Sequence, residues 1–254
     1  MNPKGLLNKP DSLSVIESIY KISLGLKDNS SLIPQIIEDL KRVLNSAHKN
    51  QTSIKTVNYI ERFSSKGQFK SKLWLIQKLK KIEFFELGQV FLCAGWCGTL
   101  AYLLFQEKTL KVKQIFNFDK DPLSITISED LNRKWVKENW KFKATLKDIL
   151  DLNYHSAQFN TLKKDGSSQE LFVSPDTIIN TSCEHIENFT NWWKKIPKGK
   201  KMILQSNNFY EDPEHINCVS SLKHFKNQAP LSQILFKGEL NLGKYSRFML
   251  IGNK

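Results

Sequence analysis

Cysteine is scarce in this sequence, which has 4 among its 254 residues. So few cysteines do not make a disulfide scaffold, and their spacing does not match a zinc ribbon. Long apolar runs are missing too, because the longest, residues 90–105, falls short of the about 20 that cross a bilayer. The start, "MNPKGLLNKPDSL", lacks an apolar core followed by a cleavage site. We therefore expect a soluble cytoplasmic protein without a secretory signal or a membrane span.

Internal repeats and low-complexity tracts are also absent. What remains is an ordinary globular composition, with 40% hydrophobic and 25% charged residues. A chain of 254 residues can bury a sizeable core without cross-links. These features predict one substantial folded domain with an extension.

The net charge of +13 raises the question of nucleic acid, since clustered basic residues release counterions from a phosphate backbone. The excess here is mostly lysine, and it is spread along the whole chain. A dispersed charge is typical of a solvated surface. We expect a small-molecule partner, and a nucleic acid is the less favoured alternative.

The apolar run "VFLCAGWCGTLAYLLF" is best divided into two elements. As a single helix it would hold Gly95 and Gly98 in its interior, each at a cost of about 0.5–1 kcal/mol relative to alanine. Divided, residues 89–94 form a buried strand, residues 95–98 a tight turn, and residues 99–108 a helix that Thr99 caps. The pattern predicts the first strand, turn and helix of a doubly wound α/β fold.

Glycines in such a turn let the backbone approach a ligand, and the free N–H groups of the helix favour a carboxylate or a phosphate. The turn lacks the third glycine of the dinucleotide-binding fingerprint. The missing glycine argues against a nicotinamide cofactor.

Acidic residues follow the next buried stretch, residues 112–118, in "VKQIFNFDKDP". A carboxylate at the tip of the second strand can accept hydrogen bonds from both hydroxyls of an adenosine ribose, and we assign this role to Asp119. Asp121 either shares that role or only complements the dipole of the helix that Pro122 opens.

The rest of the chain supplies the other elements of an α/β sheet. After a helix over 123–139 and a short strand, Asp148 and Ile149 stand where an acid and an apolar side chain can bracket an adenine. The further predicted elements are a loop or hairpin (159–176), a fourth strand (176–180), a helix (184–196), a turn (197–200), a fifth strand (201–207) and an edge hairpin (233–253).

The first third of the chain predicts helices over residues 14–26, 31–49, 53–63 and 69–85, because its apolar residues recur at helical spacing. We expect these helices to pack on the sheet or to cover the mouth of the site. The predicted division is a helical N-terminal extension over 1–84 and an α/β domain over 85–254.

The order of these features resembles the class I S-adenosylmethionine-dependent methyltransferases, over about residues 85–254. The resemblance is carried by "AGWCG", "NFDKDP", "KDI", "INTSCEHI" and the closing hairpin. It implies a Rossmann-like, mostly parallel seven-stranded sheet with a C-terminal antiparallel hairpin. It also implies S-adenosyl-L-methionine as cofactor, bound by Ala94, Gly95, Trp96, Gly98, Asp119, Lys120, Asp148, Ile149, Asn180 and Thr181.

One position departs from the family pattern. The family's turn usually begins with an acid two residues before the first glycine, where this sequence has Cys93. The methionine amine would then be held by backbone carbonyls or by another acid. Trp96 either narrows the pocket over the cofactor or packs against the N-terminal region.

Catalytic candidates stand at the carboxyl ends of the fourth and fifth strands, where open α/β sheets bind ligands. The first strand end offers Asn180, Ser182, Cys183, Glu184 and His185, and from these we expect Asn180, Glu184 and His185 to be catalytic. His185 could act as a general base near neutral pH. Alternatively, Glu184 and His185 only cap and orient the helix that follows. The second strand end offers Gln205, Ser206, Asn207 and Asn208.

Two further absences narrow the function. The Asp/Asn-Pro-Pro-aromatic signature of base amino-methyltransferases and the Pro-Cys of cytosine C5 enzymes are both missing after the fourth strand, which disfavours a flipped base. A zinc site of Cys93, Cys97, Cys183 and His185 is conceivable, but free cysteines are commonly core residues, so we predict no metal. The alternatives left open are another S-adenosylmethionine reaction and a noncatalytic binding protein.

Overall fold

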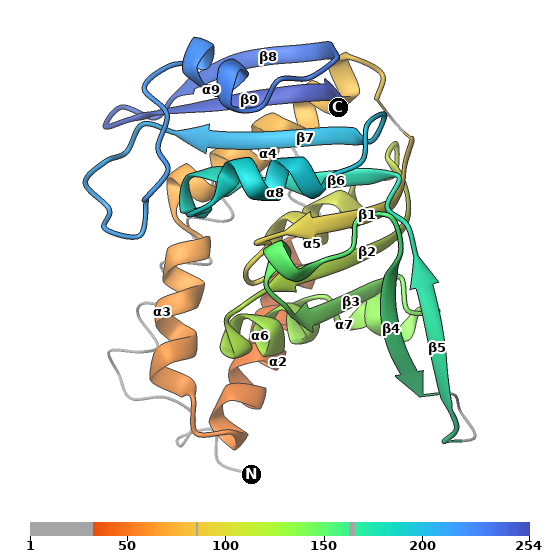
Figure 1. The fold of residues 1–254 in the computed structure, drawn as a ribbon. Helices are drawn as coiled ribbons and strands as arrows, with labels where there is room; N and C mark the ends of the chain where they lie inside the picture. The colour runs from red at the N-terminus through yellow and green to blue at the C-terminus, as the bar shows by residue number, and fades with distance from the viewer. Residues whose placement is uncertain (1–32, 85, 163–165) are drawn as a thin grey trace.

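Figure 1 shows a computed structural model of the chain, which describes residues 33–84, 86–162 and 166–254. The helix predicted over 14–26 lies outside the described residues. The described helices are α2 (Ile33–Lys49), α3 (Ser53–Phe63), α4 (Lys66–Lys81), α5 (Thr99–Gln106), α6 (Pro122–Leu131), α7 (Arg133–Lys137), α8 (Phe189–Lys195) and α9 (Leu222–Gln228), with short 3-10 turns η3 (Ile149–Asp151) and η4 (Cys183–His185).

The strands form one large sheet and a separate hairpin. Their bounds are β1 (Glu86–Cys93), β2 (Lys111–Asp119), β3 (Phe142–Leu146), β4 (Ala157–Leu162), β5 (Ser168–Val173), β6 (Thr177–Asn180), β7 (Lys201–Asn207), β8 (Gln233–Asn241) and β9 (Ser246–Asn253). The seven-stranded sheet has the order β3-β2-β1-β6-β7-β9-β8. In this sheet β3, β2, β1, β6 and β7 pair in parallel, and β9 runs antiparallel between β7 and β8. The predicted doubly wound sheet with a C-terminal hairpin is confirmed.

The apolar run at 90–105 divides as predicted, into the end of β1 and the whole of α5. Gly98, and not Thr99, occupies the cap position of α5, in a left-handed conformation with φ 68°. The cap predicted at Thr99 is therefore wrong, because Thr99 already has the first helical position. No described helix is both long and apolar enough to cross a membrane.

Two hydrophobic cores cover the two faces of the sheet. Helices α4 and α5 lie behind the sheet in the view of Figure 1, and α8 lies in front of it. The first core joins the sheet to the N-terminal helices through residues such as Leu40, Phe63, Leu75 and Leu79. The second core lies under α8 and α9 and holds Trp192 and Phe225. The central strands of the sheet are thus buried on both sides, as their apolar residues require, whereas the edge strand β8 is largely exposed.

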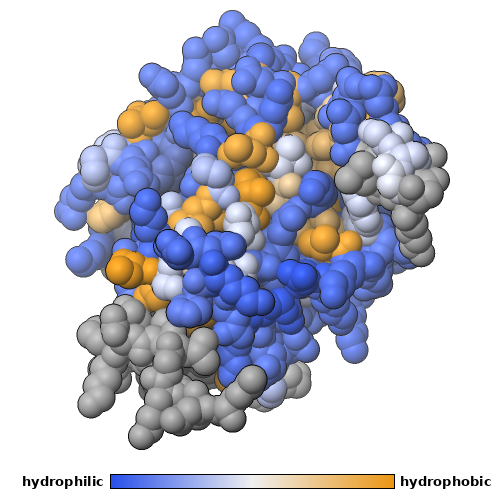
Figure 2. Space-filling model, turned by 90° about the horizontal axis from the view of Figure 1, so that it is seen from below, coloured by the Kyte–Doolittle hydropathy of each residue, from blue (hydrophilic) through white to orange (hydrophobic). Residues whose placement is uncertain are grey.

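The surface is largely polar on the face shown in Figure 2. Hydrophilic residues cover most of that face, and hydrophobic residues gather toward its middle. This distribution agrees with the ordinary globular composition of the chain.

The N-terminal helices are anchored to the sheet by polar contacts as well as by the core. The Tyr102 hydroxyl on α5 donates to Asp39 on α2 at 3.0 Å, and Arg42 pairs with the same carboxylate at 2.8 Å. Gln205 on β7 donates to the backbone carbonyl of Ser71 on α4 at 3.1 Å. The expectation that these helices pack on the sheet is met by α4, whereas α2 packs on α5 and α6.

Two predicted helices are shorter than expected. The helix predicted over 123–139 divides at Asn132, whose amide donates to the carbonyls of Gly98 and Ser128 instead of facing solvent. The helix predicted over 184–196 begins only at Phe189, behind an Asn188 cap. Glu184 and His185 therefore do not open that helix, since they belong to η4 and the Glu184 side chain is buried.

The insertion before the fourth strand of the large sheet is an antiparallel hairpin, β4–β5, with a pairing that runs from Ala157↔Val173 to Leu162↔Ser168. The prediction of a loop or hairpin there is confirmed. The predicted fourth strand is β6, one residue shorter than expected, and the predicted fifth strand is β7 without change.

A buried tyrosine joins the second core to the strand end of β1. The Tyr154 hydroxyl accepts from the Trp192 indole at 2.7 Å and donates to the Ile149 carbonyl at 2.9 Å. We expect Tyr154→Phe to lower the free energy of unfolding by about 1–3 kcal/mol, because it leaves a buried indole N–H without a partner. Urea unfolding measures the loss. Tyr210→Phe is the matched control, since Tyr210 is 61% exposed and its hydroxyl should contribute little. Equal stabilities for the two variants would contradict this account.

Candidate functional site

A pocket of about 630 Å³ lies at the carboxyl ends of β1, β2, β3 and β6. This edge is where strand order reverses, between β1 and β6, and where open α/β sheets bind ligands. Helices α3 and α4 supply the opposite wall through Tyr59, Arg62, Gln68 and Lys72. In Figure 1, α3 stands beside the strand ends, so a segment of the N-terminal third borders the site.

Most of the predicted site residues line this pocket. They are Ala94, Gly95, Trp96, Asp119, Lys120, Asp148, Ile149, Thr181 and His185. Three others, Gly98, Asn180 and Glu184, do not contribute to the lining. Asn180 and Glu184 are at most 1% exposed, and their side chains contact other protein groups.

The glycines of the turn are required by packing. A Cβ on Gly95 would stand 1.9 Å from Asn117 Oδ1, and one on Gly98 would stand 2.3 Å from the Ser128 hydroxyl. Ala94 and Trp96, on either side of Gly95, both have φ 49°. The turn is thus a tight, left-handed path pressed against β2 and α6, with its backbone open to the pocket.

Asn117 holds the turn in place, and the sequence analysis missed it. Its buried amide on β2 donates to the Trp96 carbonyl at 3.0 Å and to the Ser128 hydroxyl at 2.9 Å. The available signal was a lone amide in an otherwise apolar stretch, "IFNF". A buried polar side chain needs partners, so its presence inside a strand indicates a structural contact.

The two acids after β2 have different roles in the structure. Asp119 lines the pocket and accepts from the backbone N–H groups of Trp96 at 2.8 Å and Asp121 at 3.1 Å. Burial raises the pKa of Asp119, and the Asp121 and Trp96 N–H groups oppose that rise. Asp121 caps α6 by accepting from the N–H groups of Leu123 and Ser124. It also lines the pocket and helps burial to raise the pKa of Tyr59 to about 12.

The acid and apolar pair after β3 forms a turn at the pocket wall. Asp148 precedes η3 and accepts from the Leu150 N–H at 2.8 Å, which fixes its carboxylate beside Ile149. Both side chains line the pocket, as does Leu150. The acid and the apolar side chain thus lie side by side in the pocket wall, and their contact with an adenine stays a prediction.

Trp96 packs against the N-terminal region, which is one of the two roles that the sequence left open, and it also lines the pocket. Its ring contacts Tyr59 and Phe63 on α3, with centroids 5.5 and 6.4 Å away. The Arg62 guanidinium lies 5.6 Å from the ring centroid. The turn after β1 and helix α3 therefore form one continuous wall.

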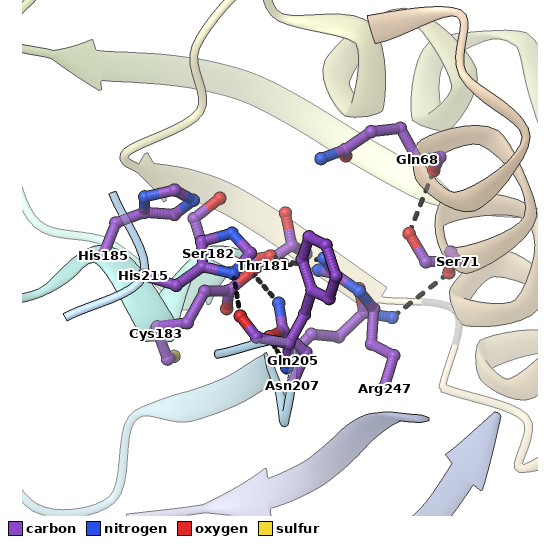
Figure 3. A network of polar contacts seen from close by, with 12 residues as sticks. Gln68, Ser71, Thr181, Ser182, Cys183, His185, Gln205, Asn207, His215 and Arg247 are labelled. Atoms are coloured by element: carbon purple, nitrogen blue, oxygen red, sulfur yellow. Dashed lines mark hydrogen bonds and ion pairs between the residues drawn. The ribbon is translucent and has the colours of Figure 1, made fainter. Parts of the chain in front are cut away.

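A buried ion pair lies at the ends of β6 and β9. Arg247 is 2% exposed, pairs with Glu184 at 3.2 Å, and donates to the Thr181 carbonyl at 2.9 Å. Asn207 donates to the same Glu184 oxygen at 2.7 Å. Figure 3 shows Thr181, Asn207 and Arg247 gathered in this network. Sequence analysis missed Arg247, because nothing in the β-run around it marks a buried charge.

The other polar residues at the ends of β6 and β7 are buried or hydrogen-bond to backbone N–H groups. Asn180 accepts from the Ser182 N–H at 2.8 Å, which shapes the loop after β6. Gln205, Ser206 and Asn207 are fully buried on β7. Asn208 accepts from the Ser246 N–H at 2.7 Å.

Lys72 is a second buried cation that the sequence did not reveal. It is 8% exposed, donates to Gln68 at 2.6 Å, and lines the pocket. Burial, and next the nearby Arg247, lower the pKa of Lys72 from 10.5 to about 7. A lysine with this pKa can exchange a proton near neutral pH.

His185 has a partner that lies far from it in the sequence, His215. The two rings lie 4.6 Å apart at nearly right angles, and both line the pocket (Figure 3). Burial lowers the pKa of His185, so its neutral form is favoured. A neutral imidazole that faces a pocket can accept a proton.

The cysteines do not assemble into the zinc site considered above. Cys93 and Cys183 lie in the core under α8, whereas Cys97 lies in the core on the other face of the sheet. The Cys93 thiol contacts the Tyr154 hydroxyl at 3.5 Å, away from the pocket lining. Burial raises the pKa of Cys93 to about 12 and that of Cys183 well above its usual range.

These elements give the chain the fold of the class I S-adenosylmethionine-dependent methyltransferases. A proposed sarcosine dimethylglycine methyltransferase from Galdieria sulphuraria superimposes with a TM-score of 0.51 at 12% identity, over 77% of this chain and 88% of that one. The cyclase SpnF gives a TM-score of 0.50 at 9% identity, over 74% and 82%. The N-methyltransferase NodS from Bradyrhizobium japonicum WM9 gives 0.49 at 11% identity, over 73% and 94%.

Comparison of the sequence with known proteins found no relative. No protein-family model matches the chain, and no curated protein matches it. At these identities the two structures with TM-scores of 0.51 and 0.50 establish the fold alone.

Proposed function

We propose that this protein is a class I methyltransferase that binds S-adenosyl-L-methionine and transfers its methyl group to a small molecule. The observation that supports the cofactor most directly is Asp119, a fixed carboxylate at the end of β2 that lines the pocket. Its two oxygens each accept one backbone N–H and keep a further lone pair for a ribose hydroxyl.

The other parts of the cofactor have matching surroundings. Asp148 and Ile149 would contact the adenine, and the backbone from Ala94 to Trp96 would approach the methionine part, with Lys120 and Thr181 at its borders. Gly98 and Asn180 would act through the shape of the backbone, because neither lines the pocket. With Cys93 turned toward Tyr154, the methionine amine would be held by backbone carbonyls.

The bound cofactor supplies an activated methyl group, so the chain's own residues have to align the acceptor and remove a proton. His185 is our candidate for the general base, since it lines the pocket and its neutral form is favoured. Glu184 and Asn180 would position it, through the Arg247 pair and the loop after β6. Helices α3 and α4 would select the acceptor, as expected of an extension over residues 1–84 that borders the α/β domain over 85–254.

Calorimetric titration with S-adenosylmethionine and S-adenosylhomocysteine tests the cofactor. We expect saturable binding of both, and Asp119→Ala should weaken it by about 1–3 kcal/mol through loss of a buried acceptor. The Asp119→Asn chain keeps one acceptor oxygen, so its affinity for the cofactor should lie between those of the parent chain and the Asp119→Ala chain. Asp151→Ala is the matched control, since Asp151 is exposed and outside the pocket lining. An absence of binding to either nucleotide would leave the chain as a noncatalytic binding protein.

The products separate methyl transfer from other reactions of the same cofactor. Methyl transfer leaves S-adenosylhomocysteine, and transfer of the aminocarboxypropyl group leaves methylthioadenosine. Mass spectrometry of the nucleoside after incubation with pooled small-molecule acceptors distinguishes them. Methylthioadenosine as the main product would replace the methyltransferase proposal with the aminocarboxypropyl one.

A further inference from the structure

A group of side chains typical of a metal centre lies beside the proposed cofactor site, formed by two histidines of the pocket wall and a buried glutamate that does not line the pocket. Glu184, His185 and His215 each offer one ligand atom, and these atoms all lie within 4.8 Å of one another. Glu184 and His185 are adjacent in η4, after β6, whereas His215 comes from the loop after β7. Two strand ends are thus needed to bring the three together. We propose that they bind one divalent transition-metal ion.

Both imidazoles are held in the tautomer that a metal requires. His185 Nδ1 lies 3.0 Å from the Glu214 carbonyl, and His215 Nδ1 lies 2.8 Å from the Phe209 carbonyl. A carbonyl oxygen only accepts, so each Nδ1 carries the proton and each Nε2 keeps its lone pair. A backbone carbonyl on the far nitrogen is the usual outer-shell partner of a metal-bound histidine.

The Glu184 carboxylate is also held in position to bind a metal ion. Oε1 of Glu184 accepts from Asn207 at 2.7 Å and pairs with Arg247 at 3.2 Å, which fixes the group. Oε2 is buried and has no hydrogen-bond partner. A buried carboxylate oxygen without a donor is costly, and a cation would satisfy it. Arg247 is engaged with Oε1 and with the Thr181 carbonyl, so Oε2 remains for another positive group.

The surroundings supply a further anionic group and an open side. Asp212 Oδ2 lies 3.9 Å from His215 Nε2, and Asp212, His185 and His215 all line the pocket. Two imidazole nitrogens and one carboxylate oxygen suit zinc and neighbouring divalent metals, and leave coordination positions open. Those positions would face the pocket. On the basis of the proposed function, they would bind an oxygen or nitrogen atom of the acceptor. In the metal-bound chain the ion, and not His185, would then activate that atom, because the Nε2 lone pair of His185 is engaged with the metal.

Titration of the metal-stripped full chain, without a histidine tag, with Zn²⁺ and Co²⁺ tests the site. We expect one ion per chain by calorimetry, and a visible Co²⁺ spectrum of nitrogen and oxygen ligation. His185→Ala and His215→Ala should each weaken binding by about 100-fold or more, since the loss of an outer-shell partner alone costs about 10–100-fold. His155→Ala, at an exposed histidine outside the pocket, should bind as the parent chain does.

The outcome does not depend on the cofactor, so the two proposals can fail separately. Specific metal binding without S-adenosylmethionine binding would support the metal centre and remove the methyltransferase proposal. An absence of one-to-one binding would overturn the metal centre, as would equal binding by His215→Ala and His155→Ala. Circular dichroism of each variant, compared with the parent, shows whether a loss of binding reflects unfolding.

Discussion

Arg247→Met is expected to lower the free energy of unfolding by about 3–5 kcal/mol, the usual cost of removing one partner of a buried ion pair. The change leaves the Glu184 carboxylate buried with Asn207 as its remaining donor. It also leaves the Thr181 carbonyl without the guanidinium that binds it at 2.9 Å. Methionine has a similar length and fills much of the same space, so the loss reports on charge and hydrogen bonding more than on packing.

Urea unfolding followed by circular dichroism measures this loss. Arg62→Met is the matched control, because Arg62 forms an ion pair with Glu214 at 3.1 Å in which both side chains are more than half exposed. An exposed pair contributes about 0–1 kcal/mol, so the control should remain close to the parent. An equally small loss of stability in both variants would show that the Glu184–Arg247 pair does not act as a buried ion pair.

Lys72→Met is expected to raise stability and to change its dependence on pH. The folded chain lowers the pKa of Lys72 from 10.5 to about 7, so between these values the unfolded state binds more protons than the folded state. Stability then rises with pH in that window, by up to about 1.4 kcal/mol per unit from this group. Below pH 7 the full cost of a buried charge is present, and above pH 10.5 it is gone.

The measurement is urea unfolding at pH 7.5 and 8.5. Unfolded thiols begin to ionise in the same range, so the contribution of Lys72 is the difference between the chains that keep it and the Lys72→Met chain. At pH 7.5 the Lys72→Met chain should be more stable than the parent by about 2–4 kcal/mol, and it should lack most of the rise between the two pH values. Lys223→Met, at an exposed lysine, is the control and should retain the rise. A rise of equal size in all three chains would show that Lys72 remains charged in the folded state.

The elements that the sequence predicted well are those whose signal is local. The β1–turn–α5 unit follows from two glycines in an apolar run, and Pro122 and Asp121 mark the start of α6. The acids of the pocket were found because each follows an apolar strand, and the carboxyl ends of parallel strands meet at one edge. The C-terminal hairpin has a regular pattern of residues around "NLGK".

The parts that were missed depend on contacts between distant segments. Arg247 and Lys72 stand in ordinary strand and helix patterns, and only the folded chain brings them to Glu184. His215 lies 30 residues beyond His185 in a loop without periodicity, so its side chain could not be placed. The prediction of a helix beginning at Glu184 was wrong for the same reason. The Glu184 side chain forms a buried ion pair with Arg247, a contact that the spacing of apolar residues in the sequence could not indicate.

The ring contacts between Trp96 and helix α3 have a consequence for how this protein can be altered. A region that selects the acceptor is often treated as a cassette, to be exchanged between enzymes while the cofactor half is kept. Here Tyr59 and Phe63 of α3 contact the side chain of Trp96, which belongs to the turn after β1. A transplanted helix would therefore need side chains that pack against the Trp96 indole. If the proposed function holds, acceptor specificity and cofactor binding would change together in any chimera.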